Sequence, residues 1–171
     1  MEVKIGKLAI GFIGYKGAGY TKWDSAFYMK NSTSDKDWSG LYIAADNDTA
    51  KGYLPDAVPE DANGNGIVYI HKAEVTEEVN LITCMDESFK TGEIDMDALR
   101  SALDKNDVKV NDKELVMTKL GELGYFFKCY NNEDGAIEII VPNSMADKIT
   151  MSPFKQCELK NYEVSKCEDI K

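Results

Sequence analysis

Two tyrosines at either end of a short capped segment are the residues of this sequence best suited to chemistry. Tyr42 lies in the apolar segment Leu41–Ala45, which predicts a strand. Asp46 follows the strand and is a good helix cap, so it predicts a helix that ends near Tyr53, with Pro55 stopping it. Delivered in this way, the two rings could line one small cleft as parallel aromatic walls, which is the arrangement that binds a flat cationic ring.

A glycine-rich string precedes the tyrosines. Residues 14–19 have the sequence Gly-Tyr-Lys-Gly-Ala-Gly, and a strand that ends in glycines lets backbone amides approach a dinucleotide closely. The spacing matches neither the Rossmann fingerprint nor a Walker loop. A simple turn at the end of a strand is therefore the alternative interpretation.

The elements that must position these residues indicate an α+β fold. Strands are predicted over residues 4–15, 41–45, 67–75, 125–130 and 136–141, and helices over residues 24–30, 46–53 and 112–120 and after Asp95. The strands cluster at both ends with helices between them, unlike the alternation of a doubly wound sheet. A single domain is predicted over residues 1–171, with a polar C-terminal tail of little periodicity from about residue 154.

The charge and hydropathy of the chain argue against nucleic acids and membranes as binding partners. The chain has 20 basic and 30 acidic residues and a formal net charge of −10, the opposite sign to a nucleic-acid surface. We therefore expect no nucleic-acid partner and a slight preference for a basic protein. No apolar run approaches the roughly 18 residues that a membrane span needs, and Leu8–Ile13 is too short for the core of a signal peptide. These features predict a monomer that does not contact membranes.

Cysteine and histidine spacing indicates no metal site. None of the four cysteines forms a Cys-x-x-Cys motif, and His71 is the only histidine. Asp61–Gly66 matches the first half of a calcium loop, but the twelfth position is Lys72, so we expect a turn. Cys157 and Cys167 could join as a disulfide that clips the tail, while four reduced thiols are about equally compatible with the sequence.

The two tyrosine-bearing strings resemble the NAD-binding core of ADP-ribosyltransferases, specifically the diphtheria toxin and exotoxin A group. That group carries Tyr-His-Gly-Thr on its first strand, where this chain has Tyr-Lys-Gly-Ala at residues 15–18. Its next block, an aromatic-Ile-Ala strand followed by Asp and Ala-x-Gly-Tyr, is similar to Tyr42–Tyr53. The resemblance spans about residues 8–145 and is specific over residues 39–53. It implies a split β-sheet core with short flanking helices.

The resemblance also implies the roles of individual residues. Tyr42 and Tyr53 would sandwich the nicotinamide of NAD, the substrate. Other NAD contacts would come from Tyr15, Lys16, Gly17 and Ala44. Glu138 would be the catalytic acid that stabilises the oxocarbenium-like ribose, with Glu133 as a second acid in the preceding turn. The alternative for Glu138 is an exposed position on an edge strand.

Two departures from the family pattern leave alternatives open. Lys16 replaces the expected His, and Lys is not an isostere of His. It could contact a phosphate of NAD, as Arg does in the cholera-like branch, or it could mark an inactive copy kept as a protein-binding module. Alignment on the exotoxin A strand would place the acid near Phe127 or Lys128, neither of which is acidic.

The function that the resemblance implies is transfer of ADP-ribose from NAD to a side chain of a target protein, with release of nicotinamide. Slow NAD hydrolysis would follow when no acceptor is present. An elongation factor is one target implied by the family, and a secreted or translocated bacterial effector is the implied setting. Residues 31–39 and 77–91 are where target contacts are expected. An unrelated α+β domain is the remaining alternative.

Overall fold

The computed structural model of the chain describes residues 1–30, 36–131 and 133–170. Its strands are β1 (Lys4–Leu8), β2 (Ile13–Ala18), β3 (Leu41–Ala44), β4 (Gly66–Val75), β5 (Val79–Cys84), β6 (Tyr125–Tyr130), β7 (Ile137–Val141), β8 (Ile149–Lys160) and β9 (Glu163–Asp169). Its α-helices are α1 (Ser25–Lys30), α2 (Asn47–Lys51), α3 (Ser88–Thr91), α4 (Met96–Asp104) and α5 (Val116–Leu123). The 3-10 helices are η1 (Leu54–Ala57), η2 (Glu60–Ala62) and η3 (Asn143–Lys148).

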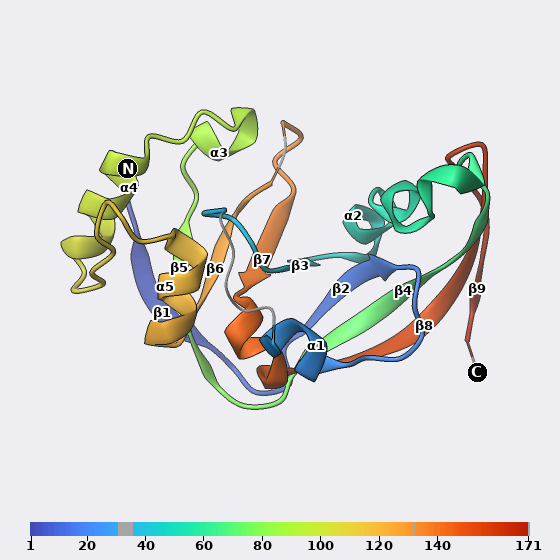
Figure 1. Cartoon of the computed structure of the whole chain (residues 1–171), viewed down its shortest axis with the longest axis horizontal. Helices are drawn as coiled ribbons and strands as arrows, with labels where there is room; N and C mark the ends of the chain where they lie inside the picture. Colours follow the sequence, from blue (N-terminus) through green and yellow to red (C-terminus); the bar gives the residue numbers. More distant parts are fainter. Residues whose placement is uncertain (31–35, 132, 171) are drawn as a thin grey trace.

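The strands form one mixed sheet in the order β1-β5-β6-β7-β3-β2-β4-β8-β9, with few helices. Within the described residues, every neighbouring pair is antiparallel except β5 and β6. This architecture is compatible with the α+β class. The two termini lie at opposite ends of the molecule (Figure 1).

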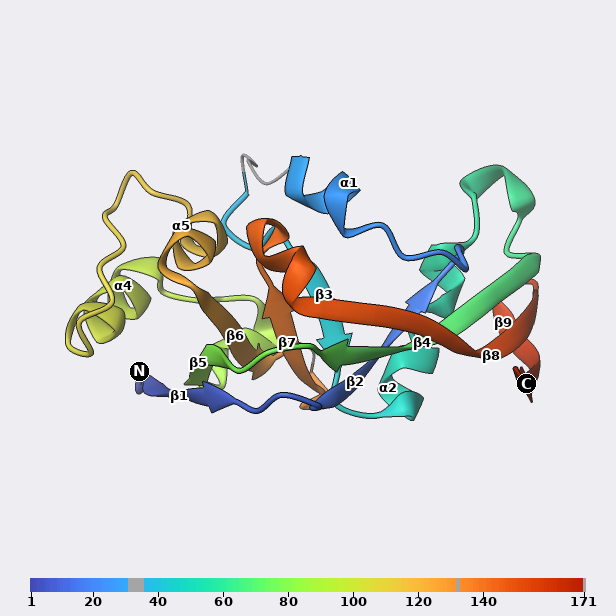
Figure 2. The ribbon, with the colours of Figure 1, turned by 90° about the horizontal axis from the view of Figure 1, so that it is seen from below.

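The sheet is weakest at its middle. β2 and β3 are joined by a single residue pair, Tyr15 with Ala44, whereas β3 and β7 share four pairs. We call β1-β5-β6-β7-β3 the first half-sheet and β2-β4-β8-β9 the second half-sheet. Figure 1 shows α3, α4 and α5 beside the first half-sheet and α2 beside the second, and Figure 2 shows the same places for α4, α5 and α2. The strands therefore separate on either side of the Tyr15–Ala44 pair.

Three groups of buried side chains make up the core. One lies between the first half-sheet and α3, α4 and α5, and includes Phe127 and Leu103. A second contains residues from both half-sheets, such as Phe126 and Met151. The third packs α2 and η1 against the second half-sheet, with Leu54 fully buried. Each half-sheet therefore has its own helical cover, and the second group joins them.

Local signals predicted several elements correctly. Asp46 caps α2 by accepting a hydrogen bond from the Thr49 amide at 2.7 Å, and Asp95 caps α4 through the Ala98 amide at 3.0 Å. The predicted hairpin of β6 and β7 is present. These features depend on contacts between residues close in sequence.

Other predictions were wrong. Residues 4–15 form no single strand, because Gly11 adopts a left-handed φ of 86° and the chain turns there. β1 then joins the first half-sheet and β2 the second. The segment 77–91 contains β5, which was not predicted. No strand was predicted in the polar tail from about residue 154, but the tail completes β8 and forms β9. A disulfide joins Cys157 to Cys167 there, which was one of the two alternatives for these cysteines.

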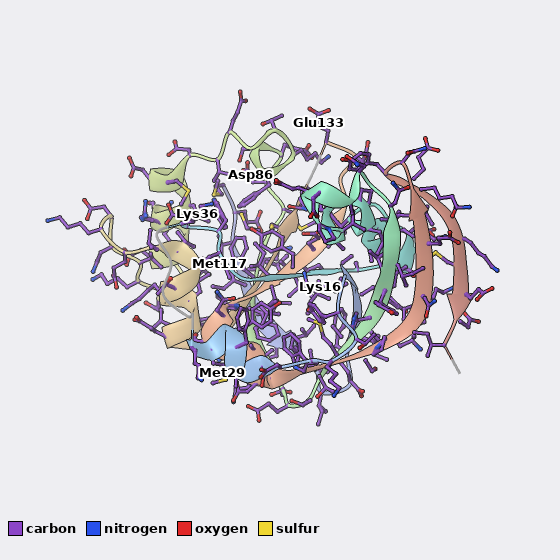
Figure 3. All side chains as sticks on the ribbon, turned by 45° about the vertical axis from the view of Figure 1, so that its right-hand side comes forward. Lys16, Met29, Lys36, Asp86, Met117 and Glu133 are labelled. Atoms are coloured by element: carbon purple, nitrogen blue, oxygen red, sulfur yellow. A yellow bond between two sulfur atoms is a disulfide. The ribbon has the colours of Figure 1, made fainter. Side chains whose placement is uncertain are left out.

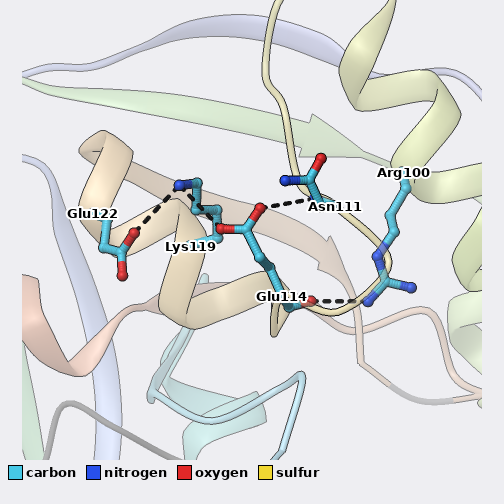
Figure 4. A network of polar contacts seen from close by, with 5 residues as sticks. All are labelled: Arg100, Asn111, Glu114, Lys119 and Glu122. Carbon is cyan, nitrogen blue, oxygen red and sulfur yellow. Dashed lines mark hydrogen bonds and ion pairs between the residues drawn. The ribbon is translucent and has the colours of Figure 1, made fainter.

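Helix α5 begins four residues later than predicted, at Val116 instead of Asp112. A turn occupies the preceding residues, in which the Asn111 amide donates to the Glu114 carboxylate at 3.0 Å. Arg100 of α4 donates to the Glu114 carbonyl at 3.0 Å, and Lys119 of α5 pairs with the Glu114 carboxylate at 3.1 Å (Figure 4). These contacts keep the turn out of the helix.

Candidate active site

A cleft of about 530 Å³ opens where β2 and β3 separate. Its volume lies within the range of about 300–1,000 Å³ that is typical of small-molecule sites. Its walls include every residue predicted to contact NAD, together with the predicted catalytic acid: Tyr15, Lys16, Gly17, Tyr42, Ala44, Tyr53 and Glu138. The tertiary structure thus brings together residues from β2, β3, β7 and the segment between α2 and η1.

Gly17 lets the helical wall of the cleft approach β2. A Cβ at this position would lie 2.9 Å from the Leu54 side chain and 3.0 Å from the Ala50 carbonyl oxygen. The second of these contacts is with backbone, which cannot move aside easily. Any larger residue at position 17 would therefore push α2 and η1, and with them Tyr53, away from the strand.

The two tyrosines reach the cleft from different elements. Tyr42 projects from β3, and its hydroxyl donates to the Trp38 carbonyl at 2.6 Å. Burial raises the pKa of Tyr42 to about 12, and the nearby Cys129 and Glu138 add to the effect. Tyr53 follows α2, and its hydroxyl oxygen accepts a hydrogen bond from Asn131 Nδ2 at 2.5 Å. Both phenols are thus held by the protein and present their rings to the cleft.

Glu138 lies deep in the cleft. It is on β7, an interior strand between β6 and β3, and the residue is only 1% exposed, so the edge-strand alternative is wrong. Burial raises the pKa of Glu138, while hydrogen bonds from Tyr53 and Asn131 and the positive charge of Lys16 act in the opposite direction. Its Oε2 has no hydrogen-bond partner within the described part of the chain. A buried carboxylate oxygen without a hydrogen bond is costly, and this one can accept a hydrogen bond from a molecule that enters the cleft.

Lys16 brings a cationic group to the same cleft. Burial lowers the pKa of Lys16, and the Glu138 carboxylate partly offsets this effect. Lys16 pairs across the sheet with His71 of β4. The His71 ring is fully buried, and its Nε2 donates to the Tyr20 carbonyl at 2.7 Å. His71 is therefore part of the support behind β2, while Lys16 is the cation that an anionic ligand would meet.

Asn131 is a site residue that sequence reasoning missed. It follows β6 directly, lines the cleft and donates a hydrogen bond to the Tyr53 hydroxyl. The turn that it begins was recognised only as a hairpin signal. The hairpin register could have identified it. Cys129 pairs with Glu138, and Asn131, two residues after Cys129, lies on the same face of the sheet as Glu138 and diagonally across from it.

Some predicted positions are not brought to the cleft. Glu133 lies exposed at the tip of the β6–β7 turn, apart from Lys16 (Figure 3), and does not line the cavity. Of the expected target-contact segments, residues 31–35 lie outside the described residues. Residues 36–39 line a neighbouring hollow that shares Tyr42 with the cleft. Much of the segment 77–91 is taken up by β5 and α3.

The described part of the chain offers no cluster of metal-binding side chains and no membrane-spanning helix. Across residues 1–30, 36–131 and 133–170, no group of three or more His, Cys, Asp or Glu side chains is placed to hold a metal ion. The calcium-like string at residues 61–66 forms part of η2 and the turn before β4. None of the helices described is long and apolar enough to cross a membrane.

No protein-family model matches the sequence, and no curated protein matches it either. The feature of this protein that points to a function is the cleft itself, with the buried acid, the tyrosines and the lysine that line it.

Proposed function

We propose that this protein is a mono-ADP-ribosyltransferase that transfers ADP-ribose from NAD to a side chain of a target protein. The observation that carries the proposal is the unpartnered Oε2 of Glu138, buried in a cleft that two tyrosines also line. An acid fixed in this way suits a reaction in which positive charge develops on a sugar. The proposal includes an ADP-ribosyltransferase-like split sheet, which the single β2–β3 pair supports.

Each residue of the cleft would have its own role in this reaction. Tyr42 and Tyr53 would stack on the cationic nicotinamide ring, whose glycosidic bond to ribose breaks. Glu138 Oε2 would accept a hydrogen bond from a ribose hydroxyl and stabilise the positive charge that develops at C1. Lys16 would attract the phosphates of NAD. An acceptor atom would then bond to C1 and lose its proton, while nicotinamide leaves with the bonding electrons.

The proposed partner is a protein that carries the acceptor side chain. A target protein, of which an elongation factor is one example that the resemblance suggests, would dock at the mouth of the cleft. A secreted or translocated bacterial effector is the corresponding setting. The net charge of −10 favours a partner with a basic surface.

Lys16 supports a second candidate function, a protein-binding module that has lost its activity. The position expected to carry a His side chain holds a half-buried lysine in this chain, with its pKa lowered by partial burial. In that case the cleft would no longer bind NAD, and the surface around it would bind a protein.

Nicotinamide release from NAD distinguishes these functions. The pure protein, with and without cell lysate, is compared with Glu138→Gln, which keeps the shape of the side chain but loses the charge. Removing a preorganised electrostatic stabiliser typically costs about 10²–10³-fold in rate, and we expect a loss of this size. We also expect labelled ADP-ribose on a lysate protein with wild type only.

Glu133→Gln tests the competing acid five positions away. Because Glu133 is exposed in the turn and outside the cleft lining, this variant is expected to keep the wild-type rate. A loss in Glu133→Gln combined with full activity in Glu138→Gln would move the acid to the turn. Absence of both NAD turnover and NAD binding in wild type would favour the binding module.

A further inference from the structure

The two aromatic walls of the cleft belong to different halves of the sheet. Tyr42 lies on β3 of the first half-sheet, whereas Tyr53 lies between α2 and η1. The buried residues Ala50 and Leu54 on either side of Tyr53 pack with side chains of β4 and β8 in the second half-sheet, beside which Figure 1 shows α2. Because β2 and β3 share a single residue pair, the sheet itself does little to fix one ring relative to the other.

A side-chain hydrogen bond joins these two walls. Asn131 follows β6 in the first half-sheet, and its Nδ2 donates to the Tyr53 hydroxyl oxygen at 2.5 Å, although the two residues are 78 positions apart in the chain. β7 pairs with both β6 and β3, so Asn131 and Tyr42 belong to the same set of paired strands. Both Asn131 and Tyr53 line the cleft. The bond therefore connects the wall that carries Tyr53 to the half-sheet that carries Tyr42.

The backbone at each end of this hydrogen bond is held by other contacts. The Asn131 amide donates to the Ala136 carbonyl at 2.9 Å, which extends the β6–β7 ladder. The Tyr53 amide donates to the Ala50 carbonyl at 3.2 Å, and the Tyr53 carbonyl accepts from the Asp56 amide at 3.1 Å. These backbone bonds leave the χ1 rotamer of Tyr53 undetermined. The hydroxyl lies at the far end of the ring, on the ring axis, so a hydrogen bond there fixes the direction in which the ring points.

We propose that Asn131 is a positioning residue, which holds the ring of Tyr53 in the orientation that covers one face of a flat aromatic ligand while Tyr42 covers the other. The inference rests on the proposed function, which identifies that ligand as the nicotinamide ring of NAD. Because the effect is on the aromatic wall, it extends to free nicotinamide, the product, as well as to NAD. It assigns Asn131 no part in the electrostatic stabilisation of the ribose.

Asn131→Leu is the first test, because Leu is close to Asn in size and its side chain has no N–H donors. Losing one hydrogen bond changes an equilibrium constant by about 3–10-fold. We therefore expect the Kd of nicotinamide and the Kd of NAD, measured by titration calorimetry, to rise in parallel by about 3–10-fold. The kcat of nicotinamide release should change less than about threefold, because the wall binds the ring in the ground state and in the transition state alike.

A double-mutant cycle shows whether Asn131 acts through Tyr53. Tyr53→Phe removes the hydroxyl that accepts the hydrogen bond and keeps the ring. In that background Asn131→Leu should raise the Kd of nicotinamide by less than about twofold further, since the bond is already lost. Full multiplication of the two separate effects would overturn the inference. Asn106→Leu is the matched control, because Asn106 Nδ2 donates to the Ala102 carbonyl at 2.9 Å outside the cleft, and this variant should keep the wild-type Kd values.

A measurement without NAD separates failure of this inference from failure of the proposed function. Three-bond NMR couplings to the Tyr53 Cγ report its χ1 rotamer, which should be single in wild type and averaged among rotamers in Asn131→Leu. Unchanged couplings in the folded variant would overturn the role of Asn131, even if wild type cleaves NAD. A wild type that binds neither NAD nor nicotinamide would overturn the proposed function instead, while the couplings would still decide whether Asn131 orients the ring.

Discussion

Glu138 is the proposed catalytic acid, and its burial is unfavourable for the stability of the folded protein. Its carboxyl is buried on an interior strand, and Oε2 has no hydrogen-bond partner in the described structure. A folding core gains nothing from a carboxylate placed in this way, because burial disfavours its charged form. Such conflicts between stability and local chemistry are typical of functional sites. The same residue should therefore affect activity and stability in opposite directions.

Replacing Glu138 with Gln should stabilise the protein at neutral pH. Because burial raises the pKa of Glu138, the folded protein holds this proton more tightly than the unfolded chain does. The resulting stability is present below the unfolded pKa of about 4.3 and is lost as the pH rises through the folded pKa. Removing the buried charge should gain about 1 kcal/mol near pH 8, or about 2–4 °C in Tm.

Thermal unfolding from about pH 4 to pH 8 checks this prediction, since the gain should vanish at the acid end. Glu133→Gln serves as the exposed control and should change Tm little at either pH. A lower Tm for Glu138→Gln at neutral pH would contradict the prediction. It would mean that the hydrogen bonds from Tyr53 and Asn131 outweigh the cost of burial.

At the scale of elements, contacts between segments far apart in sequence hold the walls of the cleft. Helix α5 has no side-chain cap from the residue before it; instead the Val116 amide donates to the Asp37 carboxylate at 2.9 Å. The Met117 amide donates to the Asp37 carbonyl at 2.9 Å, and Arg100 approaches the same carboxylate at 3.6 Å. The residue after Asp37 is Trp38, whose carbonyl binds the Tyr42 hydroxyl. The anchored segment thus supports one tyrosine of the cleft.

Asp37→Ala should destabilise the protein through loss of this cap. Helix caps contribute about 0.5–2 kcal/mol, so we expect a loss of about 1 kcal/mol and a fall of about 2–4 °C in Tm. Asp37→Asn is the matched variant, because its amide oxygen still accepts the Val116 hydrogen bond and only the charge is lost. It should cost less than half as much in thermal unfolding. Equal losses in the two variants would show that the charge interaction with Arg100 dominates.

At the scale of the whole molecule, the cleft depends on two half-sheets that meet at one residue pair. β2 and β3 diverge on either side of this pair. Both half-sheets stay folded there because each has its own group of buried side chains. The core of the second half-sheet includes Leu54 and Cys157, both fully buried. The Leu54 side chain lies against Gly17. The disulfide of Cys157 with Cys167 therefore belongs to the support of the wall that carries Tyr53.

Removing this disulfide should lower the stability of the whole domain. The two cysteines are 10 residues apart, and closing a loop of this length contributes about 2–3 kcal/mol by constraining the unfolded chain. We expect the variant Cys157→Ala/Cys167→Ala to unfold about 4–12 °C below oxidised wild type. Reductant should lower the Tm of wild type and leave that of the variant unchanged. An oxidised wild type that is no more stable than the variant would contradict the prediction.

Local signals were enough for part of the fold. Asp46 and Asp95 cap helices through amides three residues away, and the hairpin of β6 and β7 depends on its own turn, so each could be predicted from a short window. β5 could not be predicted in this way, because its partner strands β1 and β6 are distant from it in the chain and its pairing with β6 is parallel. The start of α5 was also hidden, because Asp37 supplies its cap from 79 residues away.

By itself, the sequence determined which chemical groups are available and how nearby residues are arranged. It determined that Tyr42 and Tyr53 flank a capped helix and that Glu138 lies on a strand. Only the tertiary structure decided that these groups share one cleft, that Glu138 is buried and that Asn131 donates to Tyr53. The physical reason is that burial and sheet register are set by strands distant in sequence, here by the opening of β2 from β3 and the insertion of β7 between β6 and β3.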